Sequence, residues 1–147
     1  RLGVGRGGVQ LQERIEDVCA QALAKSNPLT AVVAVAPVWA LLSPYFHEEP
    51  SAAGPPTLIA NGSDDPTIRP SSSIDLFERI DPPRVYLEVA GAHHSDLIEN
   101  VGPPEPFLAP TERAARAFLD AVLAGRAAEL DSTLRDLEGE GNAVRRD

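Results

Sequence analysis

Two acidic residues and two histidines stand directly after neighbouring apolar runs in this chain. Asp64 and Asp65 follow one short run, and His93 and His94 follow the next. His94 comes 29 residues after Asp65, which is the length of about one helix and one strand. A carboxylate and the imidazole that it orients are two of the three groups of a hydrolytic triad. Taken singly, Asp-Asp-Pro is ordinary turn chemistry and a loop histidine is usually inert, so the hypothesis depends on the two motifs together.

The elements that would position these residues are strands. Residues 30–36 form a continuous run rich in β-branched residues and alanine, which is typical of a strand covered on both faces. Residues 57–60 and 85–89 are the second and third predicted strands, and the alternation in residues 85–89 favours a position near the sheet edge. Strands that alternate with helices predict a parallel sheet, whose carboxyl ends meet at one edge. We therefore predict the α/β class, as a partial doubly wound parallel sheet of three strands with flanking helices.

Four helices are expected around these strands. The first covers residues 11–22, and the second follows Pro70 with Ser72 or Ser73 as its N-cap. Thr111 is expected to cap the third helix, and a fourth amphipathic helix completes the fold. The predicted inner faces of the last three helices are Ile74, Phe77 and Ile80; Ala115, Phe118, Leu119 and Val122; and Leu130, Leu134 and Leu137. Residues 1–138 would form part of a single domain, and residues 139–147 a polar, disordered tail.

Composition limits the possible functions. The net charge is −9, from 13 basic and 22 acidic residues, which argues against nucleic acid and anionic membranes as partners. The single cysteine, Cys19, cannot form an internal disulfide and leaves the compartment open. The chain contains no methionine and opens on Arg1, and three strands are few for such a sheet, so we expect a fragment or processed piece of a longer protein.

A metal site is an alternative interpretation of the same residues. His93, His94 and Asp96, with Asp64 or Asp65, offer the nitrogen and oxygen ligands of a metal-dependent hydrolase. Adjacent histidines on a strand or loop point in different directions, which disfavours a shared ion. We therefore predict neither a metal nor another cofactor.

These motifs resemble a known family. The segment Leu-Ile-Ala-Asn-Gly-Ser-Asp-Asp-Pro-Thr-Ile-Arg-Pro, followed by Val-Tyr-Leu-Glu-Val-Ala-Gly-Ala-His-His, is similar to the C-terminal half of an α/β-hydrolase. The closest likeness is to cutinase-like and dienelactone-hydrolase-like esterases, over about residues 30–125. The resemblance implies that Asp65 is the triad acid and His94 the triad base, with Asp64 as the alternative acid. His93 occupies a variable position of the family pattern.

The sequence differs from that family at the position of the nucleophile. The family requires Gly-x-Ser-x-Gly at a strained turn between a strand and a helix. The nearest match here is a degenerate elbow made of Gly3, Gly5, Arg6 and Gly7, in which Gly5 stands where the serine should be. The sequence thus presents an acid and a base without an identifiable serine nucleophile.

The six residues from Gly3 to Gly8 also fit Gly-x-Gly-x-x-Gly, the dinucleotide-binding fingerprint, with glycines at 3, 5 and 8. That motif needs a preceding strand, and only Arg1 and Leu2 precede Gly3. It also needs an acidic residue after the following strand, where Ala36-Pro37-Val38-Trp39 stands instead. Nucleotide binding is therefore the weaker interpretation.

The resemblance implies a carboxylic-ester hydrolase that acts on a small-molecule ester. Trp39, Tyr45 and Phe46, in a proline-rich connection, are expected to form a wall for the substrate. Without a serine nucleophile, we expect this chain to show no serine-esterase turnover. The alternative is a non-catalytic pseudo-hydrolase or a truncated binding module. An uncovered edge strand would also favour association.

Overall fold

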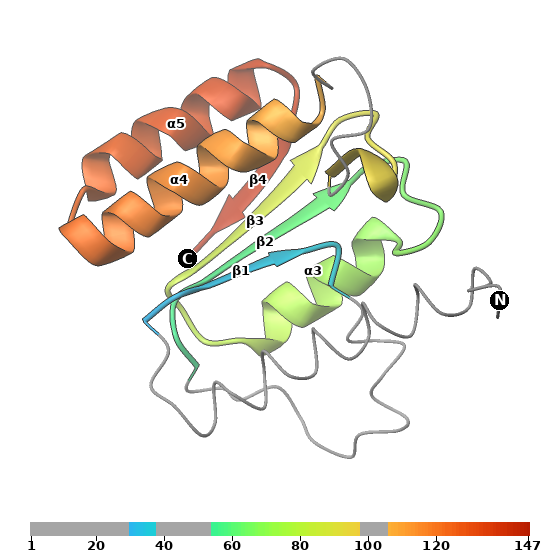
Figure 1. The fold of residues 1–147 in the computed structure, drawn as a ribbon. Coiled ribbons are helices and arrows are strands. Elements are labelled where there is room, and N and C mark those ends of the chain that lie inside the picture. The colour runs from blue at the N-terminus through green and yellow to red at the C-terminus, as the bar shows by residue number, and fades with distance from the viewer. Residues whose placement is uncertain (1–29, 38–53, 98–105) are drawn as a thin grey trace, which may run out of the picture.

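The computed structural model describes residues 30–37, 54–97 and 106–147 of the chain (Figure 1). The elements in chain order are β1 (Val32–Val35), β2 (Thr57–Gly62), α3 (Pro70–Arg79), β3 (Arg84–Val89), the 3-10 turn η1 (Ser95–Leu97), α4 (Leu108–Ala124), α5 (Ala127–Gly139) and β4 (Ala143–Arg146). The three predicted strands and the three helices that fall in these ranges are all present. The predicted helix over residues 11–22 lies outside the described residues.

The sheet has four strands in the order β1-β2-β3-β4. β1 pairs with β2, and β2 with β3, in parallel, whereas β4 pairs with β3 in the antiparallel direction. The predicted α/β class is confirmed, but the sheet is mixed rather than purely parallel. The parallel register sets Gly62 beside Val89, so the carboxyl ends of β2 and β3 lie side by side at one end of the sheet.

The C-terminal end corrects the prediction of a disordered tail. Residues 143–146 form β4, and the backbones of Arg84 and Asp147 exchange two hydrogen bonds of 3.1 and 3.2 Å. The Arg84 guanidinium also donates to an Asp147 carboxylate oxygen at 2.6 Å. Because these partners are 63 residues apart, tertiary contacts rather than local propensity hold this polar segment in the sheet.

β3 lies one strand in from the edge of the sheet, between β2 and the edge strand β4, which agrees with the predicted position near the edge. The polar side chains that suggested an edge position find partners within the fold. Tyr86 is 1% exposed, and its hydroxyl donates to Glu88 at 2.9 Å. Burial and the neighbouring Glu88 carboxylate raise the pKa of the Tyr86 phenol well above its usual range.

Helices cover both faces of the sheet, as Figure 1 shows. The helices α4 and α5 pack on one face, over a cluster that includes Leu58, Leu87 and Phe118. Helix α3 covers the other face, where Phe77 and Tyr86 lie in a smaller cluster. This arrangement buries alternate side chains of β2 and β3 on opposite faces, which is the pattern of a central parallel strand.

The predicted helix starts were too late in the chain. Helix α3 begins at Pro70 and makes no side-chain cap, so Ser72 and Ser73 lie inside it. Proline favours the first helical position because its missing N–H needs no partner there. Helix α4 begins at Leu108, which places Thr111 inside the helix, where it is buried.

The predicted inner faces are largely those observed. Phe118, Leu134 and Leu137 are buried in the core, but the prediction was wrong for Leu119, which is 36% exposed. Within the described ranges, no helix is both long and apolar enough to cross a membrane.

Candidate active site

The loops that follow β2 and β3 lie side by side because their backbones pack at contact distance. Gly62 is the last residue of β2, and a Cβ atom there would collide with the backbone of Ala92, whose carbonyl carbon would be 2.7 Å away. The amide of Asp64 donates to the Ala92 carbonyl at 3.0 Å. A glycine at position 62 therefore allows the two loops to approach each other.

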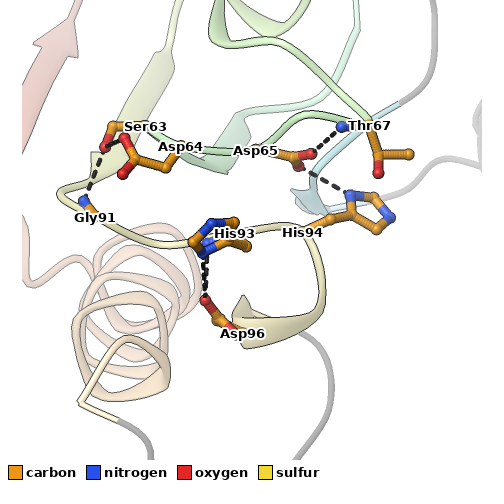
Figure 2. A network of polar contacts seen from close by, with 8 residues as sticks. All are labelled: Ser63, Asp64, Asp65, Thr67, Gly91, His93, His94 and Asp96. Atoms are coloured by element: carbon orange, nitrogen blue, oxygen red, sulfur yellow. Dashed lines mark hydrogen bonds and ion pairs between the residues drawn. The ribbon is translucent and has the colours of Figure 1, made fainter.

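Asp65 occupies the first of these loops and is 3% exposed. Its Oδ1 atom accepts hydrogen bonds from the amides of Thr67 and Ile68, at 2.7 and 2.8 Å. Asn61 steadies the same turn, because its side-chain amide donates to the Ile68 carbonyl at 3.0 Å. These bonds fix the carboxylate and leave Oδ2 directed at the second loop (Figure 2).

His94 meets Asp65 from the loop after β3. Its Nδ1 atom lies 2.9 Å from Asp65 Oδ2, and its side chain is 21% exposed. An ionised carboxylate only accepts hydrogen bonds, so Nδ1 carries the proton and donates it to Asp65. In the neutral form of the ring, Nε2 is then the unprotonated nitrogen, and it lies on the side of the ring away from Asp65 (Figure 2). The predicted acid and base thus lie together.

Asp64, the alternative acid, has a different partner. It is exposed, and its Oδ1 atom accepts a hydrogen bond of 3.0 Å from the Ser63 hydroxyl. The same hydroxyl oxygen accepts a 2.8 Å bond from the amide of Gly91. Among the contacts found in the described residues, Asp65 rather than Asp64 is the partner of His94.

His93 forms a second, more exposed pair with Asp96. Asp96 Oδ2 accepts a hydrogen bond from the His93 amide at 2.8 Å and lies 3.4 Å from His93 Nδ1. The His93 side chain is 61% exposed. Figure 2 shows the rings of His93 and His94 directed to different partners. Across the described ranges, no group of three or more His, Cys, Asp or Glu side chains is arranged to hold a metal ion.

The remaining predicted site residues are not placed. The degenerate elbow (Gly3, Gly5, Arg6 and Gly7) and the proposed substrate wall (Trp39, Tyr45 and Phe46) lie outside the described residues. Their roles stay predictions.

Sequence reasoning missed three supporting side chains. Ser63 and Asn61 belong to the motif that carries Asp65, but nothing in their spacing indicated which atoms they contact. Asn142, between α5 and β4, accepts a 3.2 Å hydrogen bond from the amide of Ala90, in the loop that leads to His94. That contact was hidden because the C-terminal segment was expected to be disordered.

Comparison of the sequence with protein-family models and with curated proteins found no match. The chemistry of the residues themselves therefore carries the functional interpretation.

Proposed function

We propose that Asp65 and His94 are the acid and base of a carboxylic-ester hydrolase site of the serine type. The observation that carries this proposal is the 2.9 Å contact between His94 Nδ1 and a carboxylate that is almost fully buried. A buried aspartate that already accepts two backbone hydrogen bonds is held still. An orienting acid needs this property, because its task is to fix the tautomer and the direction of the imidazole.

In the proposed reaction, His94 Nε2 takes the proton of a hydroxyl nucleophile as its oxygen attacks the ester carbonyl. The resulting imidazolium is stabilised by Asp65 and returns the proton to the leaving alcohol when the tetrahedral intermediate collapses. Water then enters, and His94 repeats the two proton transfers to release the carboxylic acid. Asp65 stays ionised throughout.

The side-chain exposure of the two groups supports this division of labour. The Asp65 side chain is 0% exposed and the His94 side chain 21% exposed. The acid is thus shielded from water, while part of the imidazole is open to an incoming group. General acid–base groups need this combination of a fixed geometry and access to the reacting atom.

Gly5 stands at the position of the serine in the Gly-x-Ser-x-Gly motif, so Gly5→Ser tests the proposed function directly. It would restore Gly-x-Ser-x-Gly in a chain that otherwise has no such motif. We expect the wild-type chain to resist labelling by a fluorophosphonate probe. The Gly5→Ser variant should become labelled and should hydrolyse p-nitrophenyl esters, and both gains should disappear when His94→Ala is added.

Two results would contradict this proposal. One is a folded Gly5→Ser variant that reacts with the probe no faster than the wild type. The other is labelling that survives His94→Ala, since the serine would then react without the proposed base.

A non-catalytic pseudo-hydrolase is the second candidate, and one observation favours it. The 147 residues contain no Gly-x-Ser-x-Gly motif. In that case the same site would bind a small ester or carboxylate without turning it over. Saturable binding of a non-hydrolysable ester analogue to the wild-type chain, weakened by His94→Ala, would support this alternative if Gly5→Ser stayed inert.

A further inference from the structure

We propose that Ser63 is a positioning residue, which holds the loop that carries His94 so that the imidazole faces Asp65. This role rests on the proposed function, because it concerns the acid–base pair of that site. Ser63 itself has no contact with either ring nitrogen of His94 among the described interactions. It acts on the backbone three residues before that histidine.

The two loops leave the sheet together but contact each other at few points. The β2–β3 ladder ends at the pair Gly62 and Val89. Beyond it, two backbone hydrogen bonds continue the pairing, from Ser63 N to Val89 O and from Asp64 N to Ala92 O, each 3.0 Å long. Both bonds join backbone atoms, so any residue except proline at positions 63 and 64 could donate them.

Apart from the contact of Asp65 with His94, one hydrogen bond found between these two loops requires a particular side chain. The Ser63 hydroxyl oxygen accepts the Gly91 amide at 2.8 Å. Gly91 has a left-handed φ of 75°, which turns the chain sharply between β3 and the histidines. The Ser63 hydroxyl therefore fixes the turn at the point where the path of the chain toward His94 is decided.

Asp64 sets the direction of the Ser63 hydroxyl. Ser63 Oγ donates its proton to Asp64 Oδ1 at 3.0 Å, which leaves its lone pairs available to Gly91. Figure 2 shows the resulting chain of contacts from Asp64 through Ser63 to Gly91. The adjacent aspartates thus divide the work: Asp65 pairs with the imidazole, and Asp64 helps to place the loop that carries it.

Ser63→Ala tests this role in the full chain by NMR. It removes the acceptor, so hydrogen exchange at the Gly91 amide should become faster by about ten-fold, as the loss of one hydrogen bond implies. The His94 Nδ1 proton, shifted downfield by its bond to Asp65, should weaken or move. Ser63→Thr keeps the hydroxyl and should restore both signals. Ser71→Ala, the same change at an exposed residue of α3, is the matched control.

Asp64→Ala provides a second variant if Ser63→Ala fails to fold. Asp64 is exposed, and its backbone contact to Ala92 does not depend on the side chain. We expect smaller changes in the same two signals, because the hydroxyl remains but is no longer oriented.

The proposal is overturned if a folded Ser63→Ala chain matches Ser71→Ala in both signals, or if Ser63→Thr fails to restore them. These signals do not depend on ester hydrolysis, so the two proposals can fail separately. If Ser63→Ala moves both signals while Gly5→Ser stays inert, Ser63 keeps its positioning role and the hydrolase function fails. If Gly5→Ser is active and Ser63→Ala changes nothing, only the role of Ser63 fails.

Discussion

Two adjacent histidines in this chain each meet an aspartate, but the two pairs are built differently. His94 pairs with Asp65, which is 29 residues away and belongs to another strand end. His93 pairs with Asp96, only three residues away in the same loop. The first pair exists only when β2 and β3 are assembled, whereas the second needs one local turn. A histidine next to an aspartate is thus not by itself a site.

The burial of the acids separates the pairs further. The Asp65 side chain is 0% exposed, and the Asp96 side chain is 24% exposed. Asp65 has both oxygens engaged, by two backbone amides and by His94. The Asp96 side chain mainly caps the amide of His93, just before the 3-10 turn. The comparison teaches that the buried, long-range pair has the fixed geometry that acid–base chemistry requires.

The largest expected difference between the pairs is in activity. In the Gly5→Ser background, His94→Ala should slow fluorophosphonate labelling and ester hydrolysis by about 100-fold or more, the usual contribution of a general base. His93→Ala should leave both rates within about two-fold, because His93 lies in the exposed pair. Equal losses in the two variants would erase the proposed distinction.

The second difference is in stability, measured by urea unfolding of the otherwise unmodified chain. Asp65→Ala leaves the amides of Thr67 and Ile68 and the His94 ring without their acceptor, so we expect a loss of about 3 kcal/mol in the free energy of unfolding. Asp96→Ala should cost about 1 kcal/mol, because its partners can turn to water. A larger loss for Asp96→Ala would contradict the comparison.

Gly62→Ala should weaken the contact of His94 with Asp65 and leave the contact of His93 with Asp96 unchanged. The added methyl group meets the Ala92 backbone, which must shift, at an expected cost of about 2 kcal/mol. The contact of His94 with Asp65 should weaken, while the local contact of His93 with Asp96 persists in NMR spectra. Gly139→Ala is the matched control: no atom from outside its own helix backbone and chain neighbours lies within 4 Å of the added methyl group, and α5 should gain at most about 0.8 kcal/mol because Gly139 is its last residue.

The smallest expected effect is a loss of stability at alkaline pH, which limits the pH range in which the stabilities of the pair variants can be compared. The Tyr86 phenol, with its raised pKa, keeps its proton in the folded chain above about pH 10, where an unfolded tyrosine releases it. The unfolded state then binds fewer protons, so stability falls as pH rises, by about 1.4 kcal/mol per pH unit. Tyr86→Phe should remove that slope from the urea-derived stability, and an unchanged slope would assign the alkaline loss to other groups.

Sequence patterns predicted the strands and the acid–base pair for the same physical reason. Continuous apolar runs mark buried parallel strands, and parallel strands bring their carboxyl ends to one edge. Asp65 and His94 follow such runs, so their meeting could be expected from strand order alone. The preference for Asp65 over Asp64 came from family resemblance, and the observed contact agrees with it.

Other features could not be predicted because they depend on partners that are distant in sequence. β4 is short and polar, and its place in the sheet depends on Arg84, 63 residues away from Asp147. Asn142 contacts Ala90 across 52 residues. The hydrogen bond between Ser63 and Gly91 forms only after β2 and β3 have aligned. Local propensity contains no information about any of these contacts.

The central claim is that Asp65 fixes His94 with Nδ1 protonated and Nε2 free to act as a base. Nitrogen NMR of the two imidazoles in the wild-type chain, at a pH where they are neutral, tests it most directly. We predict an Nδ1–H tautomer for His94, with a downfield Nδ1 proton that disappears in Asp65→Asn and persists in Asp96→Asn. An Nε2–H tautomer, or a His94 signal that Asp65→Asn leaves unchanged, would contradict it.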